Sequence, residues 1–234
     1  MLEAIELSKN YQGHAALVGL DLNVEPGQVF CLLGANGAGK TTTIHLFLGF
    51  LEPSAGKALV GGVEVAQSPI KARRKLAYIP EQVQLYDSLS GLENLAFLTA
   101  LTGRQERDET TLLGFLERAG LEAEAAPRRL STYSKGMRQK VAIAVALATG
   151  AEALLLDEPT SGLDPQASAE LSALLQQLAG DGVAVLMATH DLFRAKEVGH
   201  RLGIMKRGRL LEVLDASTVD HAQLEQIYLE HMHE

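Results

Sequence analysis

The 234-residue sequence contains no tryptophan, one cysteine and only 5% aromatic residues, although 47% of its residues are hydrophobic. The single cysteine, Cys31 in the apolar run VFCLL, excludes a disulfide framework and fits a reducing compartment. The apolar residues are mostly leucine, alanine and valine. This composition favours helices layered on a sheet over a β-sandwich.

Long hydrophobic runs and an excess of basic charge are also lacking. No stretch reaches the roughly 18–20 apolar residues that span a bilayer, and residues 1–10 alternate like a strand rather than like a signal peptide. We therefore expect a soluble protein that reaches a membrane only through a partner. A formal net charge of −8 argues against broad nucleic-acid binding, which needs a basic face.

Short apolar runs alternate with amphipathic segments, which predicts βαβ units and a mostly parallel sheet. The apolar runs are QVFCLL, ALLLD and VAVLMAT, and each precedes a helical pattern. Two glycine-turned segments, 57–65 and 202–213, are expected to form antiparallel strands at the margin of this sheet.

The middle of the chain, residues 86–149, has a helical pattern without a clear strand. The predicted fold is therefore α/β, with a mostly parallel core sheet, an antiparallel β part and an inserted helical subdomain. We expect a single domain over 1–234. It comprises a core from 1–85 and 150–217, the helical subdomain 86–149 and a C-terminal helix 218–234.

A phosphate-binding loop is predicted at residues 34–42, GANGAGKTT, which match G-x-x-x-x-G-K-[ST] between a strand and a helix. Glycines let the backbone N–H groups turn inward around phosphate oxygens, and the positive end of the following helix points to the same place. Lys40 is expected to reach the β- and γ-phosphates, Thr41 to hold Mg²⁺ and Thr42 to lie near the α-phosphate. The ATP-binding residues predicted in this loop are Gly34, Ala35, Asn36, Gly37, Ala38, Gly39, Lys40, Thr41 and Thr42.

Two carboxylates follow the apolar run 153–157, at the sheet edge where open α/β sheets bind ligands. Asp157 is predicted to reach Mg²⁺, and Glu158 to polarise the water that attacks the γ-phosphate. His190 ends another apolar run, at the same predicted edge. A neutral imidazole there would donate to the γ-phosphate and orient the water.

The polar stretch STYSKGMRQK, residues 131–140, precedes a predicted buried helix. In isolation it is a helix cap. Together with the P-loop, the later LLLDEPTSGLD and the TH pair, it resembles the ATP-binding cassette ATPases, the nucleotide-binding subunits of ABC transporters. The resemblance covers essentially the whole chain.

The resemblance implies roles for residues that spacing alone does not assign. In this family two cassettes dimerise head to tail, and the signature loop of one caps the ATP on the P-loop of the other. Ser134, Lys135 and Gly136 stand at the signature position, with Ser134, Gly136 and the helix dipole facing the γ-phosphate. Tyr11 matches the aromatic residue that stacks on adenine. Asp164 matches the loop that communicates between the two sites.

The sequence departs from the family pattern at two loops. Lys135 and Met137 replace the usual glycine and glutamine of the signature. Where the family has a glutamine that senses Mg²⁺, this chain has Glu81 with Gln82 beside it, and the sequence leaves open which of the two serves. The YSKGM motif resembles the cassettes of two-component exporters of the drug, sodium, antibiotic-immunity or polysaccharide type, and that of a copper-site maturation system.

The predicted function is therefore an ATP-binding and ATP-hydrolysing subunit of an ABC transporter, using ATP and Mg²⁺. Its expected partners are a transmembrane permease and a second ATP-binding subunit, expected to be an identical copy, without nucleic acid. The resemblance implies a cytoplasmic protein at the inner face of the membrane, serving an exporter and contacting its permease between about Glu81 and Leu101. The alternatives are a soluble ABC-type ATPase coupled to a non-transport process, and a P-loop kinase or regulatory module.

Overall fold

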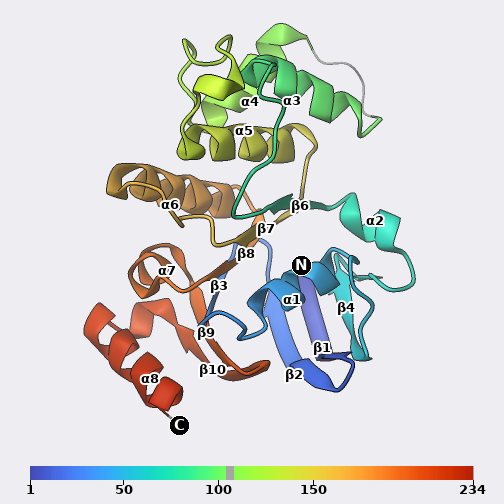
Figure 1. Cartoon of the computed structure of the whole chain (residues 1–234), viewed down its shortest axis with the longest axis vertical. Coiled ribbons are helices and arrows are strands. Elements are labelled where there is room, and N and C mark those ends of the chain that lie inside the picture. The colour runs from blue at the N-terminus through green and yellow to red at the C-terminus, as the bar shows by residue number, and fades with distance from the viewer. Residues whose placement is uncertain (104–107, 234) are drawn as a thin grey trace.

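The computed structural model describes residues 1–103 and 108–233, so that four residues of the predicted helical subdomain and Glu234 lie outside the described residues. Two sheets and a group of helices make up the structure (Figure 1). The larger sheet has six strands in the order β10-β9-β3-β8-β7-β6, and the smaller has four in the order β2-β1-β4-β5. The predicted α/β fold, with a mostly parallel core sheet and an antiparallel part, is confirmed.

The six-stranded sheet is parallel except at one edge, where β10 runs antiparallel to β9. Its central strands are buried on both faces. This explains why they consist of apolar residues, except for the last residue of β7 and of β8. The strands are β3 (Val29–Leu33), β6 (Leu76–Ile79), β7 (Ala153–Asp157), β8 (Ala184–Thr189), β9 (Arg201–Lys206) and β10 (Arg209–Asp215).

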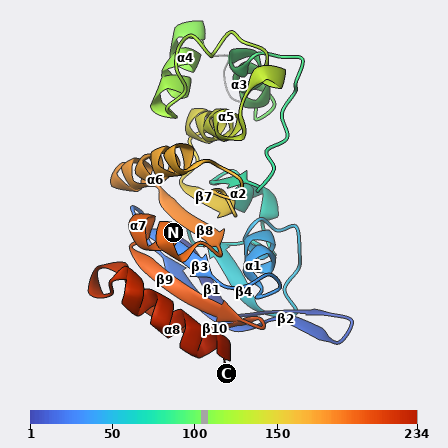
Figure 2. The same ribbon diagram turned by 60° about the vertical axis from the view of Figure 1, so that its left-hand side comes forward.

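The four-stranded sheet is antiparallel throughout and packs over helix α1, which lies between the two sheets (Figures 1 and 2). Phe47 of α1 is fully buried there, in one apolar cluster with residues of both sheets. The strands are β1 (Leu2–Tyr11), β2 (His14–Val24), β4 (Ala55–Val60) and β5 (Val63–Glu64), and the helix is α1 (Lys40–Phe47).

Side chains alternate between two apolar clusters on the opposite faces of the six-stranded sheet. Phe30 and Leu32 of β3 face α1 and the smaller sheet, whereas Cys31 and Leu33 face the helices on the other side. The helices that follow the sheet strands are α2 (Pro69–Arg73), α6 (Pro165–Gly180), α7 (Leu192–Val198) and α8 (His221–His233), with the 3-10 turn η2 (Ala216–Thr218) before α8.

Residues between β6 and β7 form a group of helices at one end of the molecule, beyond α6 (Figures 1 and 2). Ser90 caps the first of them in a reciprocal capping box with Glu93. The elements are α3 (Gly91–Ala100), α4 (Glu109–Arg118), the 3-10 turn η1 (Leu130–Thr132) and α5 (Lys135–Ala148).

The expected position of the two hairpins is partly wrong. The segment 57–65 belongs to the separate four-stranded sheet, because β4 pairs with β1 and not with any strand of the larger sheet. The segment 202–213 does lie at one margin of the larger sheet, but β9 also pairs in parallel with β3. Strands β2 and β6 were not predicted. In the described parts of the chain, no helix has both the length and the apolar character needed to cross a bilayer.

Candidate functional site

The glycine-rich segment 34–42 forms a tight turn between β3 and α1, and glycine is required at several of its positions. Gly37 and Gly39 have φ angles of +81° and +109°, which other residues rarely adopt. A Cβ on Gly39 would lie 2.8 Å from the Ala16 carbonyl oxygen, and one on Gly34 would lie 2.5 Å from that of Met205. Backbone atoms of β2 and β9 therefore lie against the turn and leave no room for side chains at Gly39 and Gly34.

Lys40, at the start of α1, places its ammonium group inside this turn. The Nζ atom donates to the Gly34 carbonyl oxygen at 2.6 Å and lies 3.3 Å from Glu158 Oε1. Only 6% of the lysine side chain is exposed. A buried cation is thus held by a backbone carbonyl and one carboxylate, in a loop whose shape favours anions.

Asp157 at the end of β7 faces the first turn of α1, where Thr41 Oγ1 donates to Asp157 Oδ2 at 2.8 Å. Burial raises the pKa of Asp157 above its ordinary value, the Thr41 hydrogen bond acts in the opposite direction, and the adjacent Glu158 raises it further. A hydroxyl and a carboxylate side by side are hard oxygen ligands of the kind that Mg²⁺ prefers. These two residues therefore fit the predicted metal role.

Glu158 adopts a φ of +46°, a left-handed conformation that is uncommon for a non-glycine residue and is also seen here at Glu6, Gln12 and Arg207. Its backbone N–H donates to the Ala188 carbonyl oxygen at 2.8 Å, and its Oε2 lies 2.8 Å from His190 Nδ1. Because a carboxylate only accepts, Nδ1 carries the proton of this bond. In neutral His190 the Nε2 atom is then an acceptor, so that donation from Nε2 to a phosphate requires the imidazolium form.

One cavity of about 390 Å³ joins most of the predicted nucleotide-site residues. Both Glu81 and Gln82 are exposed, but only Glu81 lines this cavity, which favours Glu81 for the predicted Mg²⁺ role. A Cβ on Gly37 would meet no protein atom within 4 Å and would project into open space at this cavity. The lining residues are Tyr11, His14, Ala16, Ala35, Asn36, Gly37, Ala38, Gly39, Lys40, Thr41, Thr42, Glu81, Asp157 and Glu158.

Tyr11 stands at the end of β1 on the rim of this cavity and is 41% exposed. The Lys9 ammonium lies 5.3 Å from the centre of its ring. An exposed aromatic face at the edge of a phosphate loop is suited to stacking on a base.

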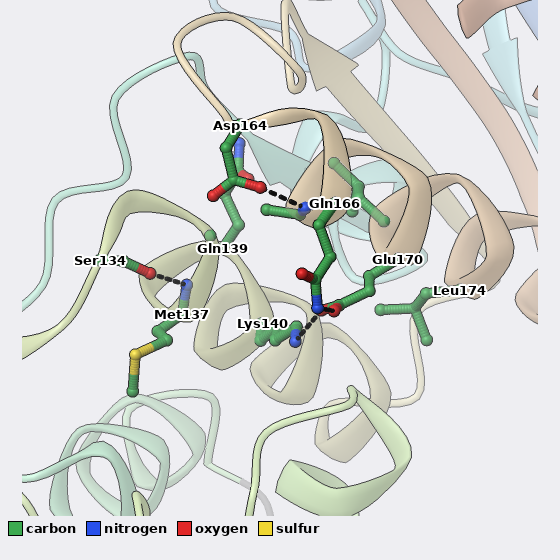
Figure 3. Close-up of a pocket in the computed structure, with 11 residues that line it drawn as sticks. Ser134, Met137, Gln139, Lys140, Asp164, Gln166, Glu170 and Leu174 are labelled. Atoms are coloured by element: carbon green, nitrogen blue, oxygen red, sulfur yellow. Dashed lines mark hydrogen bonds and ion pairs between the residues drawn. The ribbon is translucent and has the colours of Figure 1, made fainter.

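The signature residues lie elsewhere, beside a second cavity of about 260 Å³ between α5 and α6 (Figure 3). Ser134 caps α5 by accepting from the Met137 N–H at 3.3 Å, and Asp164 caps α6 by accepting from the Ala167 N–H at 2.8 Å. Gly136 also lines this cavity, and a Cβ there would lie 3.4 Å from Ala167 Cβ. In the described residues the two cavities share no lining residue.

Several features of the site were not predicted from the sequence. The Lys40–Glu158 ion pair joins two motifs, and no periodicity or spacing signals it. Ser161 Oγ donates to Glu81 Oε1 at 2.9 Å, which connects the loop after β6 with the loop after β7. His14 and Ala16 line the nucleotide-site cavity only because β2 turns back along β1.

Comparison with known proteins identifies the family of this chain. Residues 17–161 match the family described as ABC transporter. The Daunorubicin/doxorubicin resistance ATP-binding protein DrrA of Streptomyces peucetius is 36% identical over 215 residues, which cover 90% of this chain and 64% of that protein. The chain thus spans slightly less than two thirds of the length of this relative.

Two solved structures share the fold. CbiO1 of Clostridium perfringens, described as part of the ABC transporter complex cbiONQ, has a TM-score of 0.86 and 29% identity over 99% of this chain and 94% of that chain. The ATP-binding cassette MJ0796, in a dimeric structure of a post-hydrolysis state bound to ADP and Pi, has a TM-score of 0.81 and 27% identity over 92% and 99%. The chain belongs to the ABC transporter family, and it is an ATP-binding cassette of that family.

We expect Asp157→Asn to stabilise the fold at pH 7 while it weakens binding of the Mg²⁺–nucleotide complex. The asparagine still accepts from Thr41 but removes a buried charge. The pKa of Asp157 is raised in the folded protein, so its ionised form destabilises the fold. This destabilisation begins as the pH rises through the ordinary pKa of aspartate and is complete above the raised pKa of the folded protein.

The gain from the substitution should therefore be largest near neutral pH and vanish at acid pH, where both folded and unfolded chains carry a protonated Asp157. Urea unfolding of both proteins from about pH 2.5 to pH 8, a range that begins below the ordinary pKa of aspartate, measures it. A pH-independent difference between them would contradict the assignment.

Proposed function

We propose that this chain is the ATP-binding and ATP-hydrolysing subunit of an ABC transporter, which dimerises around two ATP molecules to drive a separate transmembrane subunit. The observation that carries the proposal is the single cavity that joins the P-loop, Asp157, Glu158 and Glu81. These residues come from three separate segments and supply cation, hydroxyl and carboxylate groups to one space. That combination suits a Mg²⁺–triphosphate and has no evident purpose as a structural core.

ATP binding would rest on groups that the fold already holds in place. The first N–H groups of α1 have no partner within the helix and point into the turn, where they would hold phosphate oxygens. Lys40 would exchange its contact with Glu158 for the β- and γ-phosphates, since both are anionic partners of the same ammonium. Tyr11 at the rim would stack on the adenine.

Mg²⁺ would be held by Thr41 and Asp157, together with Glu81, which lines the same cavity. An ion bound there would neutralise part of the negative charge on the phosphate oxygens. Asp157 must be ionised to serve, and its raised pKa means that it holds its proton more strongly than an ordinary aspartate does. The neighbouring Thr41 hydroxyl and Lys40 favour the ionised form.

Hydrolysis would rest on Glu158 as the base that orients and deprotonates the attacking water. His190 keeps the Oε2 atom of this carboxylate fixed at 2.8 Å, and the left-handed backbone at Glu158 turns its side chain toward Lys40 and the cavity. When charged, His190 would also present Nε2–H to the γ-phosphate. The remaining requirement is exclusion of bulk water, which one subunit with an open cavity does not provide.

A second copy of the chain would close the site. The N-terminus of α5, with Ser134 and Gly136, lies on a different surface from the P-loop of its own subunit, so it is free to cap nucleotide bound to another. The dimeric structure of the MJ0796 cassette, bound to ADP and Pi, supports dimerisation. Asp164, beside the same cavity, would then face the second subunit and communicate between the sites.

A transmembrane permease would dock on the surface between Glu81 and Leu101. Tyr86 and Phe97 make an edge-to-face pair with ring centres 5.1 Å apart, and both remain half exposed. Leu101 is 67% exposed. This apolar surface suits a protein partner.

The subunit would then sit at the cytoplasmic face of the membrane. The drug-resistance name of the Streptomyces relative supports an exporter.

We expect Glu158→Gln to lower ATP turnover by about 10²–10⁴-fold, the usual contribution of a general base, while ATP still binds. The glutamine keeps a partner for His190 but cannot take a proton. ATP should therefore remain bound and hold two subunits together. Light scattering should show a mass near twice the 25.1 kDa of one chain when ATP is added.

Glu152→Gln is the matched control, since Glu152 is an exposed glutamate that pairs with Lys75 at 3.0 Å. It should hydrolyse ATP and remain monomeric after turnover like the parent. Turnover at the parent rate in the Glu158→Gln variant would remove Glu158 from the catalytic role.

The permease proposal predicts that tagged Glu158→Gln protein, bound to detergent-solubilised native membranes in ATP, co-purifies with a polytopic membrane protein. Mass spectrometry of the eluate identifies that chain. Tyr86→Ser combined with Phe97→Ser should abolish the co-purification without loss of ATP binding. Recovery with ribosomal or DNA-associated proteins alone would favour the soluble ABC-type ATPase and contradict a transport role.

A further inference from the structure

The loop between β7 and α6, residues 158–164, is held by side chains from distant segments. Ser161 lies at its centre and makes two contacts through different atoms: its hydroxyl donates to Glu81 Oε1 at 2.9 Å, and its carbonyl oxygen accepts from Lys135 Nζ. Gln139 Nε2 donates to the Pro159 carbonyl oxygen nearby. The loop is thereby connected both to the nucleotide-site cavity and to the signature loop of the same subunit.

Lys135 occupies an electrostatically unfavourable position. It is the first residue of α5, so its cationic side chain starts from the positive end of the helix, and the first turn of α5 contains no acidic residue. The side chain instead extends to the backbone of the 158–164 loop, where its Nζ lies 3.8 Å from the place of a Cβ on Gly162. The hydrogen bond to the Ser161 carbonyl oxygen thus offsets the unfavourable interaction between the lysine charge and the positive end of the helix.

Glu81 provides the other end of the connection. Its carboxylate accepts from Ser161 and also faces the cavity that holds Lys40, Thr41 and Asp157. A carboxylate with one oxygen fixed by a hydroxyl is restricted in orientation, and a fixed orientation favours binding of a cation. Glu81 and Lys135, which depart from the family pattern in two different loops, therefore meet at one serine.

Gln139 holds the base of the same loop from inside. Its side chain is 99% buried, since only 1% of the residue is exposed, and its Oε1 lacks a hydrogen-bond partner in the described part of the chain. Figure 3 shows the Gln139 side chain extending away from α5 toward Asp164, whereas Lys140 lies near Glu170. The loop is thus anchored to α5 at Pro159 and Ser161, so that α5 and the loop move together.

We infer that Lys135 and Ser161 are positioning residues that act through Glu81. Lys135 fixes the 158–164 loop, the loop fixes the Glu81 carboxylate, and Glu81 holds the Mg²⁺ of the nucleotide bound to the same subunit. The signature loop then has a role within its own subunit besides capping the ATP of its partner. The inference rests on the proposed function, because it requires that the cavity bind Mg²⁺ and nucleotide.

The test is calorimetric titration of ADP into the dilute monomeric protein, with and without Mg²⁺. Lys135→Met should raise the Mg²⁺ concentration for half-maximal effect on ADP affinity by about threefold, within the range usual for coupling through a polar network. ADP affinity in EDTA should not change, because the P-loop contacts are intact. Lys135→Arg, which retains a charged donor, should restore most of the Mg²⁺ effect.

Ser161→Ala separates the steps, because it removes the contact to Glu81 and retains the carbonyl that Lys135 contacts. It should raise the Mg²⁺ requirement like Lys135→Met, and the double variant should add nothing further. The matched control is Lys140→Met on the same helix, whose ammonium pairs with Glu170 at 2.8 Å. It should leave the Mg²⁺ dependence unchanged.

An additive double variant, or an equal loss of affinity with Mg²⁺ and in EDTA, would overturn the inference. If the parent protein binds no ADP, the proposed function fails instead, and hydrogen exchange then tests the loop contacts alone. Amides 160–163 should exchange faster in Lys135→Met and Ser161→Ala than in Lys140→Met. Equal exchange in all three would contradict the anchoring of the loop.

Discussion

The site depends on the parallel pairing of three adjacent strands, β3, β8 and β7. Leu33 at the end of β3 stands opposite Thr189 of β8, and Asp157 at the end of β7 stands opposite Ala188. Because parallel strands end at the same edge, the segments that follow them begin side by side. These segments carry the P-loop, Glu158 and His190.

This pairing also explains the apolar composition of the strands. Each central strand contacts helices on one face and α1 with the smaller sheet on the other, so a polar residue inside a strand would lose its water without gaining a partner. Polar residues therefore appear only where the strands end. Asp157 and Thr189 are the last residues of β7 and β8, and both are at or near complete burial.

The concentration of charge at this edge opposes the stability of the fold. Lys40, Asp157 and Glu158 are largely buried within one small region, and burial raises the pKa of Asp157. Mutual pairing offsets part of the cost, since Lys40 lies between a carbonyl and Glu158, and Thr41 donates to Asp157. A site of this kind binds a polyanion and its metal because its own groups are incompletely neutralised.

Most of the architecture could be read from the sequence, because buried parallel strands are continuous apolar runs and the P-loop has a distinct glycine pattern. Strand β2 was not predicted because Gly19 interrupts its alternation of apolar and polar residues. Strand β6 was not predicted because it has only four residues. The placement of the 57–65 hairpin was wrong, since which sheet a hairpin joins depends on long-range pairing. Its local pattern carries no information about that choice.

The linear motifs predicted the site residues but not their contacts. Glu81 and Ser161 are 80 residues apart, and Lys135 reaches the same serine from another helix. Such contacts depend on loop conformation and on side-chain rotamers, which have no periodic signature. In the sequence, Lys135 stands out only as a departure from the signature pattern. Only the structure shows that its side chain contacts a loop of its own subunit.

In the proposed dimer the signature loop of one subunit closes the P-loop of another, and cross-linking between the two loops measures this contact. The native Cys31 is buried, so cysteines introduced by Asn36→Cys and Met137→Cys react without background in a Glu158→Gln protein. With a short bismaleimide, the account predicts a covalent dimer that requires ATP and forms when each of two proteins carries one of the two cysteines. Cross-linking within one chain, or equal cross-linking without ATP, would contradict it.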